Sequence, residues 1–219
     1  MSVGDAALLA ARLPALHVAT VAAAAGIVAR PTDGSFLEKT LRDGLAGQLP
    51  RAATEQPLNL DRGIWAGRLG GVDVLYTDQK TRVGVETKVW DVADSLYDVF
   101  KLAAGAQRGT IAIGYCVIAG RTRDWRAPTA IREMSQTHAG TTVEWATADV
   151  LRDHAAEWAR IWNRTAIRPT EIPARLRTVA GEPIPMLQVP DHQIRIIGVQ
   201  AIGADCLGLD SVGAALGGR

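Results

Sequence analysis

The chain has 219 residues, of which 47% are hydrophobic, and a formal net charge of +1. This hydrophobic content excludes global disorder, and the length suffices for one domain with its own core. The balanced charge excludes a strongly basic nucleic-acid coat, although it leaves room for a local basic surface. The two cysteines, Cys116 and Cys206, lack the spacing of zinc ligands and indicate free thiols in a reducing compartment.

The N-terminal stretch 13–28 is rich in alanine and poor in charge. No basic segment precedes it, and it is shorter than the ~20 apolar residues that a membrane-spanning helix needs. We therefore expect a soluble helix packed on the core, a cytoplasmic protein and no association with a membrane.

Hydrophobic periodicity and turn signals predict alternating helices and strands after a helical first 30 residues, with a break near Pro14. Leucines at every fourth position from Leu37 to Leu49 give the next helix, over 35–49, one apolar stripe. A polar connector is expected up to Asp61. The elements expected after it are strands 64–69, 72–76 and 82–90, a helix 93–107, a strand 110–119, a helix 128–138, a strand 142–146, a helix 148–164 and a strand 193–200.

This order of elements predicts an α/β fold, a three-layer sandwich around a mixed β-sheet. The nearly continuous apolar run 110–119 is typical of a strand that is covered on both faces. After Ile167, prolines divide the chain into short extended pieces. We therefore expect residues 1–167 to hold the helical lead-in and the core, and residues 168–219 to form a small β-rich extension with a flexible tail.

The third expected strand carries two charged residues on one face. Side chains alternate along a strand, so Glu86 and Lys88 point to the same side, about 7 Å apart. The strands around them are apolar, and a half-buried charge pair costs desolvation energy. One interpretation is a functional site, and the other is a surface pair on an edge strand.

The preceding strand contributes a single charge, Asp73. If the two strands form an antiparallel hairpin, Asp73 lies near Glu86, or else it merely opens the turn after Gly70-Gly71. Two carboxylates about 6 Å apart repel by roughly 3 kcal/mol at an effective dielectric constant of 20. A bound Mg²⁺ or Mn²⁺ would relieve that repulsion, lower the pKa of a bound water and polarise a phosphate, while Lys88 orients the nucleophile or balances charge.

Asp73, a gap of twelve residues and then Glu86-Thr87-Lys88 resemble the motif of the PD-(D/E)XK nuclease superfamily, which includes many restriction endonucleases. The elements over about 35–119 also resemble its restriction endonuclease-like αβββαβ core. The resemblance implies that Asp73 and Glu86 ligate the metal ion and that Lys88 assists the nucleophile. Glu38 matches an acidic residue that many members carry in the preceding helix. Val72 stands where the motif has proline.

The resemblance implies a cytoplasmic, metal-dependent endonuclease that hydrolyses DNA phosphodiester bonds, with restriction or phage defence as its setting. Homodimers are common among such enzymes, and a subunit of a larger complex is the other arrangement expected. One alternative is a catalytically inactive, nuclease-like subunit for DNA binding or assembly. Another is a toxin-like nuclease that acts on RNA.

Two candidates near the motif have competing interpretations. Glu38 ends a Ser-Phe-Leu-Glu capping box, so it could cap its own helix instead of binding metal. Lys101 stands three residues after Asp98 on a helix, which favours a solvated ion pair. Alternatively, Lys101 points back to the metal site and contacts a phosphate.

Four arginines are candidates for contact with nucleic acid. Arg121 and Arg123 lie in a basic loop around Trp125, which could stack on a base or simply pack at the loop edge. Arg160 and Arg164 are four residues apart near the end of a helix, where cations are favoured in any case. They would otherwise form a phosphate-contacting surface.

Overall fold

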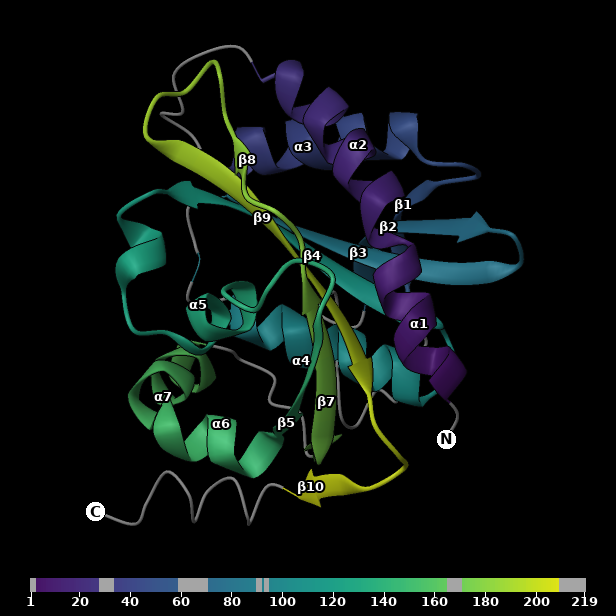
Figure 1. Ribbon diagram of the computed structural model, residues 1–219, viewed down its shortest axis with the longest axis vertical. Helices are drawn as coiled ribbons and strands as arrows, with labels where there is room; N and C mark the ends of the chain where they lie inside the picture. The colour runs from purple at the N-terminus through teal and green to yellow at the C-terminus, as the bar shows by residue number, and fades with distance from the viewer. Residues whose placement is uncertain are drawn as a thin grey trace.

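The computed structural model describes residues 3–27, 34–58, 71–89, 92, 95–164 and 171–208. In these ranges the chain forms a mixed eight-strand sheet with helices packed on it, and a separate two-strand sheet near the C-terminus (Figure 1). The α/β class and the mixed sheet are as the sequence predicts.

Helices and strands alternate along most of the chain. The helices are α1 (Val3–Ala11), α2 (Leu13–Ala25), α3 (Gly34–Gln48), α4 (Ser95–Gln107), α5 (Ala130–Ser135), α6 (Thr147–Asp153) and α7 (Ala155–Arg164), with a 3₁₀ turn, η2 (Asp124–Arg126). The strands are β1 (Ala53–Pro57), β2 (Gly71–Asp78), β3 (Thr81–Val89), β4 (Ile113–Arg121), β5 (Thr142–Ala146), β6 (Glu171–Pro173), β7 (Arg175–Ala180), β8 (Ile184–Pro185), β9 (His192–Ala201) and β10 (Cys206–Gly208).

The main sheet has the strand order β1-β2-β3-β4-β9-β7-β5. The short strand β8 pairs with β9 near its beginning, at Gln193 and Ile194. Only the β3–β4 pair is parallel among the described pairings, and the others are antiparallel. A parallel neighbour needs a crossover connection, and α4 supplies it between β3 and β4. The first four strands are therefore an antiparallel meander followed by one helical crossover.

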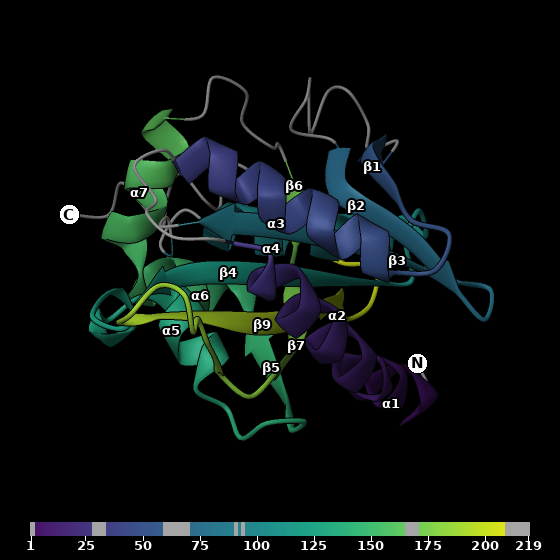
Figure 2. The ribbon, with the colours of Figure 1, turned by 90° about the horizontal axis from the view of Figure 1, so that it is seen from above.

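Helices cover both faces of this sheet, and each face has its own apolar core. Leu41 and Leu45 of α3 pack with Val85 of β3 on the face that α1, α2 and α3 cover (Figure 2). On the other face, α4 packs with β4, and its Phe100 meets Trp158 of α7 edge to face with ring centroids 5.2 Å apart. The strands β3 and β4 are thus covered on both sides, and their buried side chains are those of a sheet interior.

The hairpin between β2 and β3, on which the position of Asp73 depends, is present. Its register pairs Val74 with Val85 and Asp78 with Thr81. Gln79 and Lys80 form the turn, with φ values of 45° and 70°. Two central residues with positive φ are typical of the tight turns that match the twist of a hairpin.

Some expected boundaries differ from the structure. The polar connector before Asp61 contains the edge strand β1, and the helix expected over 148–164 is two helices that divide at His154. The strand expected over 64–69 and Gly70 of the expected turn lie outside the described residues. β7, β8 and β9 pair within the main sheet, whereas β6 and β10 form the small one. The segment after Ile167 thus contributes to both sheets.

The N-terminal helices contain the one described stretch, Ala7–Ala25, that is long and apolar enough to cross a membrane by length and composition. Within α2, one side of the helix enters the core through Leu13, Leu16 and Ala23. Its Val18 remains 68% exposed on the other side. Burial of one side against the sheet is the packing of a core helix, and the location of the protein stays a prediction.

Candidate active site

Strand β3 positions the three residues of the motif on two faces of the sheet. Glu86 and Lys88 face α4, where Glu86 is only 3% exposed. Thr87 lies between them and points to the opposite face, where it is fully buried. The alternation expected from the sequence is therefore present. Glu86 and Lys88 share one face of the sheet, and the hydroxyl of Thr87 is buried on the other.

Asp73 contacts β3 at Thr87, the residue between Glu86 and Lys88. Its Oδ2 atom accepts hydrogen bonds from the backbone N–H and from the Oγ1 hydroxyl of Thr87, each at 2.7 Å. The carboxylate of Asp73 is thereby fixed directly beside the Glu86-Thr87-Lys88 segment. This contact, together with the hairpin register, places Asp73 next to the strand segment that carries Glu86, as the sequence predicts.

Helix α4 adds two charged side chains that are buried against β3. Lys101 Nζ lies 2.7 Å from Glu86 Oε1 and 3.2 Å from Asp98 Oδ1. Asp98 and Lys101 are 4% and 5% exposed. The interpretation of this pair as solvated is therefore wrong, and Lys101 points back to the motif as the alternative predicts. The contact it makes is with Glu86 itself.

Lys88 lies between carboxylates from helices on opposite faces of the sheet. Its Nζ atom is 3.6 Å from Asp98 Oδ2 on α4 and 3.7 Å from Glu38 Oε1 on α3. The side chains of Lys88 and Glu38 are 28% and 33% exposed, so this half of the site is open to solvent. The site thus has a closed half, with Glu86, Asp98 and Lys101, and an open half that contains Lys88.

The protonation of the site follows from burial and from its mixture of charges. Burial raises the pKa of Glu86 to about 8, and the carboxylates Asp98 and Asp73 add to that rise while Lys101 opposes it. The pKa of Lys88 is raised chiefly by Asp98 and then by Glu38. Burial also raises the pKa of Glu38, against the effect of Lys88. Lys88 is consequently an ammonium group at neutral pH, able to donate hydrogen bonds and balance negative charge but unable to accept a proton.

The charges of the site do not cancel. Four carboxylates, from Glu38, Asp73, Glu86 and Asp98, share the site with two ammonium groups, from Lys88 and Lys101. The cluster carries a charge of −2 when every group is ionised, and −1 when Glu86 holds the proton that its raised pKa favours at neutral pH. Buried Oδ2 of Asp98 accepts no hydrogen bond from the described residues. Its ion-pair partner is Lys88, at 3.6 Å. An excess of carboxylates over ammonium groups is an environment that a divalent cation stabilises.

The ligand chemistry fits a hard cation, although the ligands are not gathered as a closed set. Among the described residues, no three Asp, Glu, His or Cys side chains converge as a ready-made metal site. Mg²⁺ commonly keeps several waters and is held in proteins by one or two carboxylates together with substrate phosphate. Asp73 and Glu86 can supply such a pair, with Glu38 at the open side. Lys101 is the cation that balances Glu86 in this structure.

The predicted nucleic-acid contacts lie in different places. Arg121, the last residue of β4, and Arg123 just after it are both exposed. They lie at the end of β4 that runs parallel to the part of β3 carrying Lys88. Arg160 is exposed on α7, and the side chain of Arg164 lies outside the described residues. Trp125 is 2% exposed, which confirms the interpretation that it packs at the loop edge.

Asp98 is the site residue that sequence reasoning missed. The sequence presents it only as the expected partner of Lys101, whereas the structure buries every residue of α4 from Ser95 to Gly105. An acid and a lysine three residues apart on a helix that is buried throughout call for partners in the core rather than in solvent.

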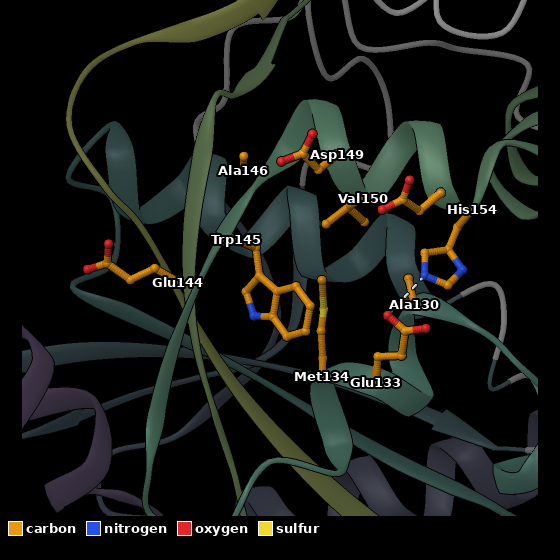
Figure 3. Close-up of a pocket in the computed structure, with 10 residues that line it drawn as sticks. Ala130, Glu133, Met134, Glu144, Trp145, Ala146, Asp149, Val150 and His154 are labelled. Atoms are coloured by element: carbon orange, nitrogen blue, oxygen red, sulfur yellow. Dashed lines mark ion pairs between the residues drawn. The ribbon is translucent and has the colours of Figure 1, made fainter.

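A separate hollow lies between α5, β5 and α6, away from the motif (Figure 3). Its lining combines Met134 and Trp145 with several carboxylates, and His154 points toward Glu133 at 3.2 Å. The Glu144 carboxylate on its rim binds Arg175 and Arg177. None of the predicted metal or catalytic residues lines it, and its Glu144, Asp149 and Asp153 pair with arginines of the chain.

No protein-family model, curated protein or solved structure matches this chain.

Proposed function

We propose that this protein is a divalent-metal-dependent nuclease of the PD-(D/E)XK type that hydrolyses DNA phosphodiester bonds. The observation that carries the proposal is the docking of the Asp73 carboxylate on Thr87, between Glu86 and Lys88 of the neighbouring strand. If the match to the motif were a coincidence of sequence, contact between Asp73 and the Glu86-Thr87-Lys88 segment would not be expected. Here Asp73 docks on the residue between Glu86 and Lys88, close to where β3 leaves its pairing with β2.

The order of the elements also supports the proposal. Helix α3, the meander β1-β2-β3, the crossover helix α4 and the parallel strand β4 follow the αβββαβ order of the restriction endonuclease-like core. The acid of the preceding helix, Glu38, reaches Lys88 from the face opposite α4. Its contact with the site favours a functional role over one confined to its own helix terminus.

Each side chain then has a role that its environment permits. When bound, Mg²⁺ or Mn²⁺ would be held by Asp73 and Glu86 and would supply Lewis-acid chemistry at a phosphate oxygen and its bound water. Lys88 remains protonated because of Asp98 and Glu38, so it acts as a hydrogen-bond donor to the attacking water or to the phosphate. Asp98 holds the ammonium groups of both lysines and sets the direction of Lys88.

One observation favours the alternative of an inactive nuclease-like DNA-binding subunit. Glu86 is almost fully buried and forms an ion pair with Lys101 at 2.7 Å, so one proposed ligand already has a counter-ion. In an active enzyme, the metal ion would compete with Lys101 for this carboxylate. In an inactive one, the ion pair would be the permanent state of the site.

The test is a cleavage assay with plasmid DNA, single-stranded DNA and RNA, each with Mg²⁺, Mn²⁺ or EDTA. We expect the wild type to cleave DNA with either ion and to be inactive in EDTA. Lys88→Ala should lower the rate by about 100-fold or more, as loss of a charge-stabilising donor does. The control Lys39→Ala removes an exposed lysine of α3 that pairs with Asp43, and it should cleave like the wild type.

The outcomes separate the candidates. Cleavage of RNA alone would replace the DNA substrate by RNA. Binding of DNA in a gel shift without cleavage under any ion condition would favour the inactive subunit. Equal cleavage by the wild type and Lys88→Ala would contradict the assignment of the site, because the activity would then come from elsewhere or from a contaminant.

A further inference from the structure

Two arginines beside the proposed active site lack the carboxylate partners that other arginines of similar burial have. Arg195 lies on β9 and Arg132 on α5, and both are half-buried. Within the described part of the chain, neither has an acidic group within ion-pair distance, and the Nε atom of each is buried without a hydrogen-bond acceptor.

The other half-buried arginines of the chain show what this environment normally contains. Arg12, with a side chain 16% exposed, pairs with Asp78. Arg42, at 17%, pairs with Glu55, and Arg177, at 14%, pairs with Glu144. A guanidinium cannot lose its proton in a protein, so a half-buried arginine without an anion leaves its charge uncompensated. Arg132 and Arg195 therefore have capacity for an anion that the described residues do not supply.

The surroundings of Arg195 hold its guanidinium in one orientation. Its Nη1 donates to the backbone oxygen and the hydroxyl of Ser135, at 3.2 and 3.1 Å. The group lies 5.0 Å from the ring centroid of Trp125, within the range of a cation–π contact. These contacts fix the planar group without neutralising it. The Ser135 hydroxyl that accepts from Arg195 also donates to the backbone oxygen of Arg132, at 2.8 Å, so the two residues flank the same serine. Burial lowers the pKa of Arg195, and the charge of Arg132 lowers it further.

The sheet register places Arg195 in line with Lys88 of the proposed active site. Lys88 of β3 is the register partner of Ile118 of β4, and Ile118 is the partner of Arg195 of β9. Partners in register share a face of the sheet, so Arg195 projects on the same side as Lys88. Two strand spacings separate them, which is about 10 Å. The exposed Arg121 is the last residue of β4, at the same end of the sheet.

We propose that Arg132 and Arg195 form a second phosphate-binding site, which takes a phosphodiester of the nucleic-acid substrate to the side of the scissile bond. The identity of the ligand rests on the proposed nuclease function, whereas the anion site rests on the two arginines alone. Guanidinium groups match phosphate oxygens in a fork geometry, and such contacts position a strand without reading its sequence. At a rise of about 3.4 Å per nucleotide, a separation of about 10 Å corresponds to roughly three nucleotides.

The first measurement tests the anion site without any need for catalysis. Inorganic phosphate is titrated into the full-length protein at constant ionic strength, and the Nε–H signals of the arginines are followed by NMR. Arg195→Gln and Arg132→Gln identify the two signals by their loss. We expect both signals to shift and saturate with phosphate but not with chloride. Signals that stay unmoved up to the highest phosphate concentration would overturn the proposal.

The second measurement connects the site to nucleic acid. Labelled duplex and single-stranded DNA are bound in EDTA at several salt concentrations. We expect Arg195→Gln and Arg132→Gln each to weaken binding about ten-fold and to lower the slope of log K against log salt by about 0.9 on duplex DNA. The control Arg152→Gln, an exposed arginine of α6 that pairs with Asp149, should leave both unchanged. Wild-type affinity and slope in both variants would contradict the role in substrate binding.

These outcomes remain distinguishable from failure of the nuclease proposal. A saturable phosphate response in a protein that cleaves nothing would keep the anion site and remove its assigned substrate. Cleavage that does not depend on either arginine would keep the nuclease and remove the site. If Arg195→Gln does not fold, Arg195→Lys replaces it in the binding assay. Lysine retains the charge but lacks the paired N–H groups of the guanidinium, so an affinity between those expected for the wild type and for Arg195→Gln is expected.

Discussion

At the scale of single residues, the charge state and orientation of Glu86 and Lys88 depend on ion-pair partners in α4 that the sequence motif does not include. Asp98 lies within 3.6 Å of Lys88 and within 3.2 Å of Lys101, so one buried carboxylate links the two cations of the site. Removing one member of a buried ion cluster leaves the others uncompensated. The motif residues therefore depend on α4 as much as on their own strand.

Glu86 should make the stability of the fold depend on pH in a direction opposite to that of most carboxylates. Its pKa is raised from 4.5 to about 8 by burial, so the folded state holds its proton more tightly than the unfolded state does. Such a group stabilises the fold below the unfolded pKa, and this contribution is lost as the pH rises through the folded pKa. The loss should therefore fall between about pH 4.5 and pH 8.

We expect Glu86→Gln to gain stability relative to the wild type across that range, because glutamine cannot ionise. Each pKa unit corresponds to about 1.4 kcal/mol, so a relative gain of at least that size is expected between pH 5 and pH 8. Urea unfolding at the two pH values, without divalent ions, measures it. A difference between the two proteins that does not change with pH would show that Lys101 keeps the carboxylate charged throughout.

Sequence reasoning reached some of these residues and not others, for physical reasons. Alternation along a strand is a local rule, so the shared face of Glu86 and Lys88 was predictable. The position of Asp73 needed a hairpin, which the turn and the alternating apolar residues indicate. Arg195 was missed because its importance lies in the absence of an acid nearby, and only the tertiary structure shows which acids are near.

At the scale of elements, the site depends on how closely α4 approaches the sheet. Gly114 of β4 allows this approach, because a Cβ atom at this position would lie 2.6 Å from the Cβ atom of Leu102 in α4. That distance is shorter than any real contact between carbons, and both atoms are attached directly to backbone. Gly114 thus sets the depth at which α4 carries Asp98 and Lys101 toward β3.

We expect Gly114→Ala to destabilise the protein by about 1–3 kcal/mol, as overpacking of a core does. In a folded variant, α4 must shift, so cleavage should fall with it. The matched control is Gly47→Ala in α3, where a Cβ atom meets nothing within 4 Å. Because glycine is unfavourable inside a helix, Gly47→Ala should stabilise by up to about 1 kcal/mol. Thermal unfolding of both variants makes the comparison, and unchanged stability in Gly114→Ala would contradict this account of the helix position.

The elements that differ from expectation had weak local signals. β1 reads Ala-Thr-Glu-Gln-Pro and alternates between half-buried and exposed positions at the sheet edge, so it lacks the apolar alternation of a strand. The break between α6 and α7 falls at His154, with no proline or glycine to mark it. In both places tertiary pairing and packing decide the structure, and the local sequence alone is compatible with either outcome.

At the scale of the whole molecule, the C-terminal segment completes the sheet that carries the site. β9 pairs with β4 along the register from Gly114–Val199 to Arg121–His192, and it separates β4 from β7. The strand expected over 193–200 is present as β9, which spans ten residues and is largely buried. Strand order across a sheet depends on contacts that are distant in sequence, which is why this insertion could not be predicted from local patterns.

The balance of charge over the folded molecule leads to a prediction about metal binding that does not require catalysis. Four carboxylates and two ammonium groups meet only in the folded state, so a divalent cation should bind the folded protein in preference to the unfolded chain. At a Mg²⁺ or Mn²⁺ concentration ten times the dissociation constant, this preference adds about 1.4 kcal/mol of stability. For a protein of this size, the midpoint of thermal unfolding should rise by about 3–6 °C.

The rise should disappear in Asp73→Asn and in Glu86→Gln, since each removes a proposed ligand. Asp153→Asn serves as the matched control, because Asp153 is an exposed acid that pairs with Arg152 far from the motif. It should keep the full response to the ion. An equal rise in Asp73→Asn and in the wild type would place the cation elsewhere on the protein and leave Lys101 as the permanent counter-ion of Glu86. Such an outcome would favour the inactive subunit over the nuclease.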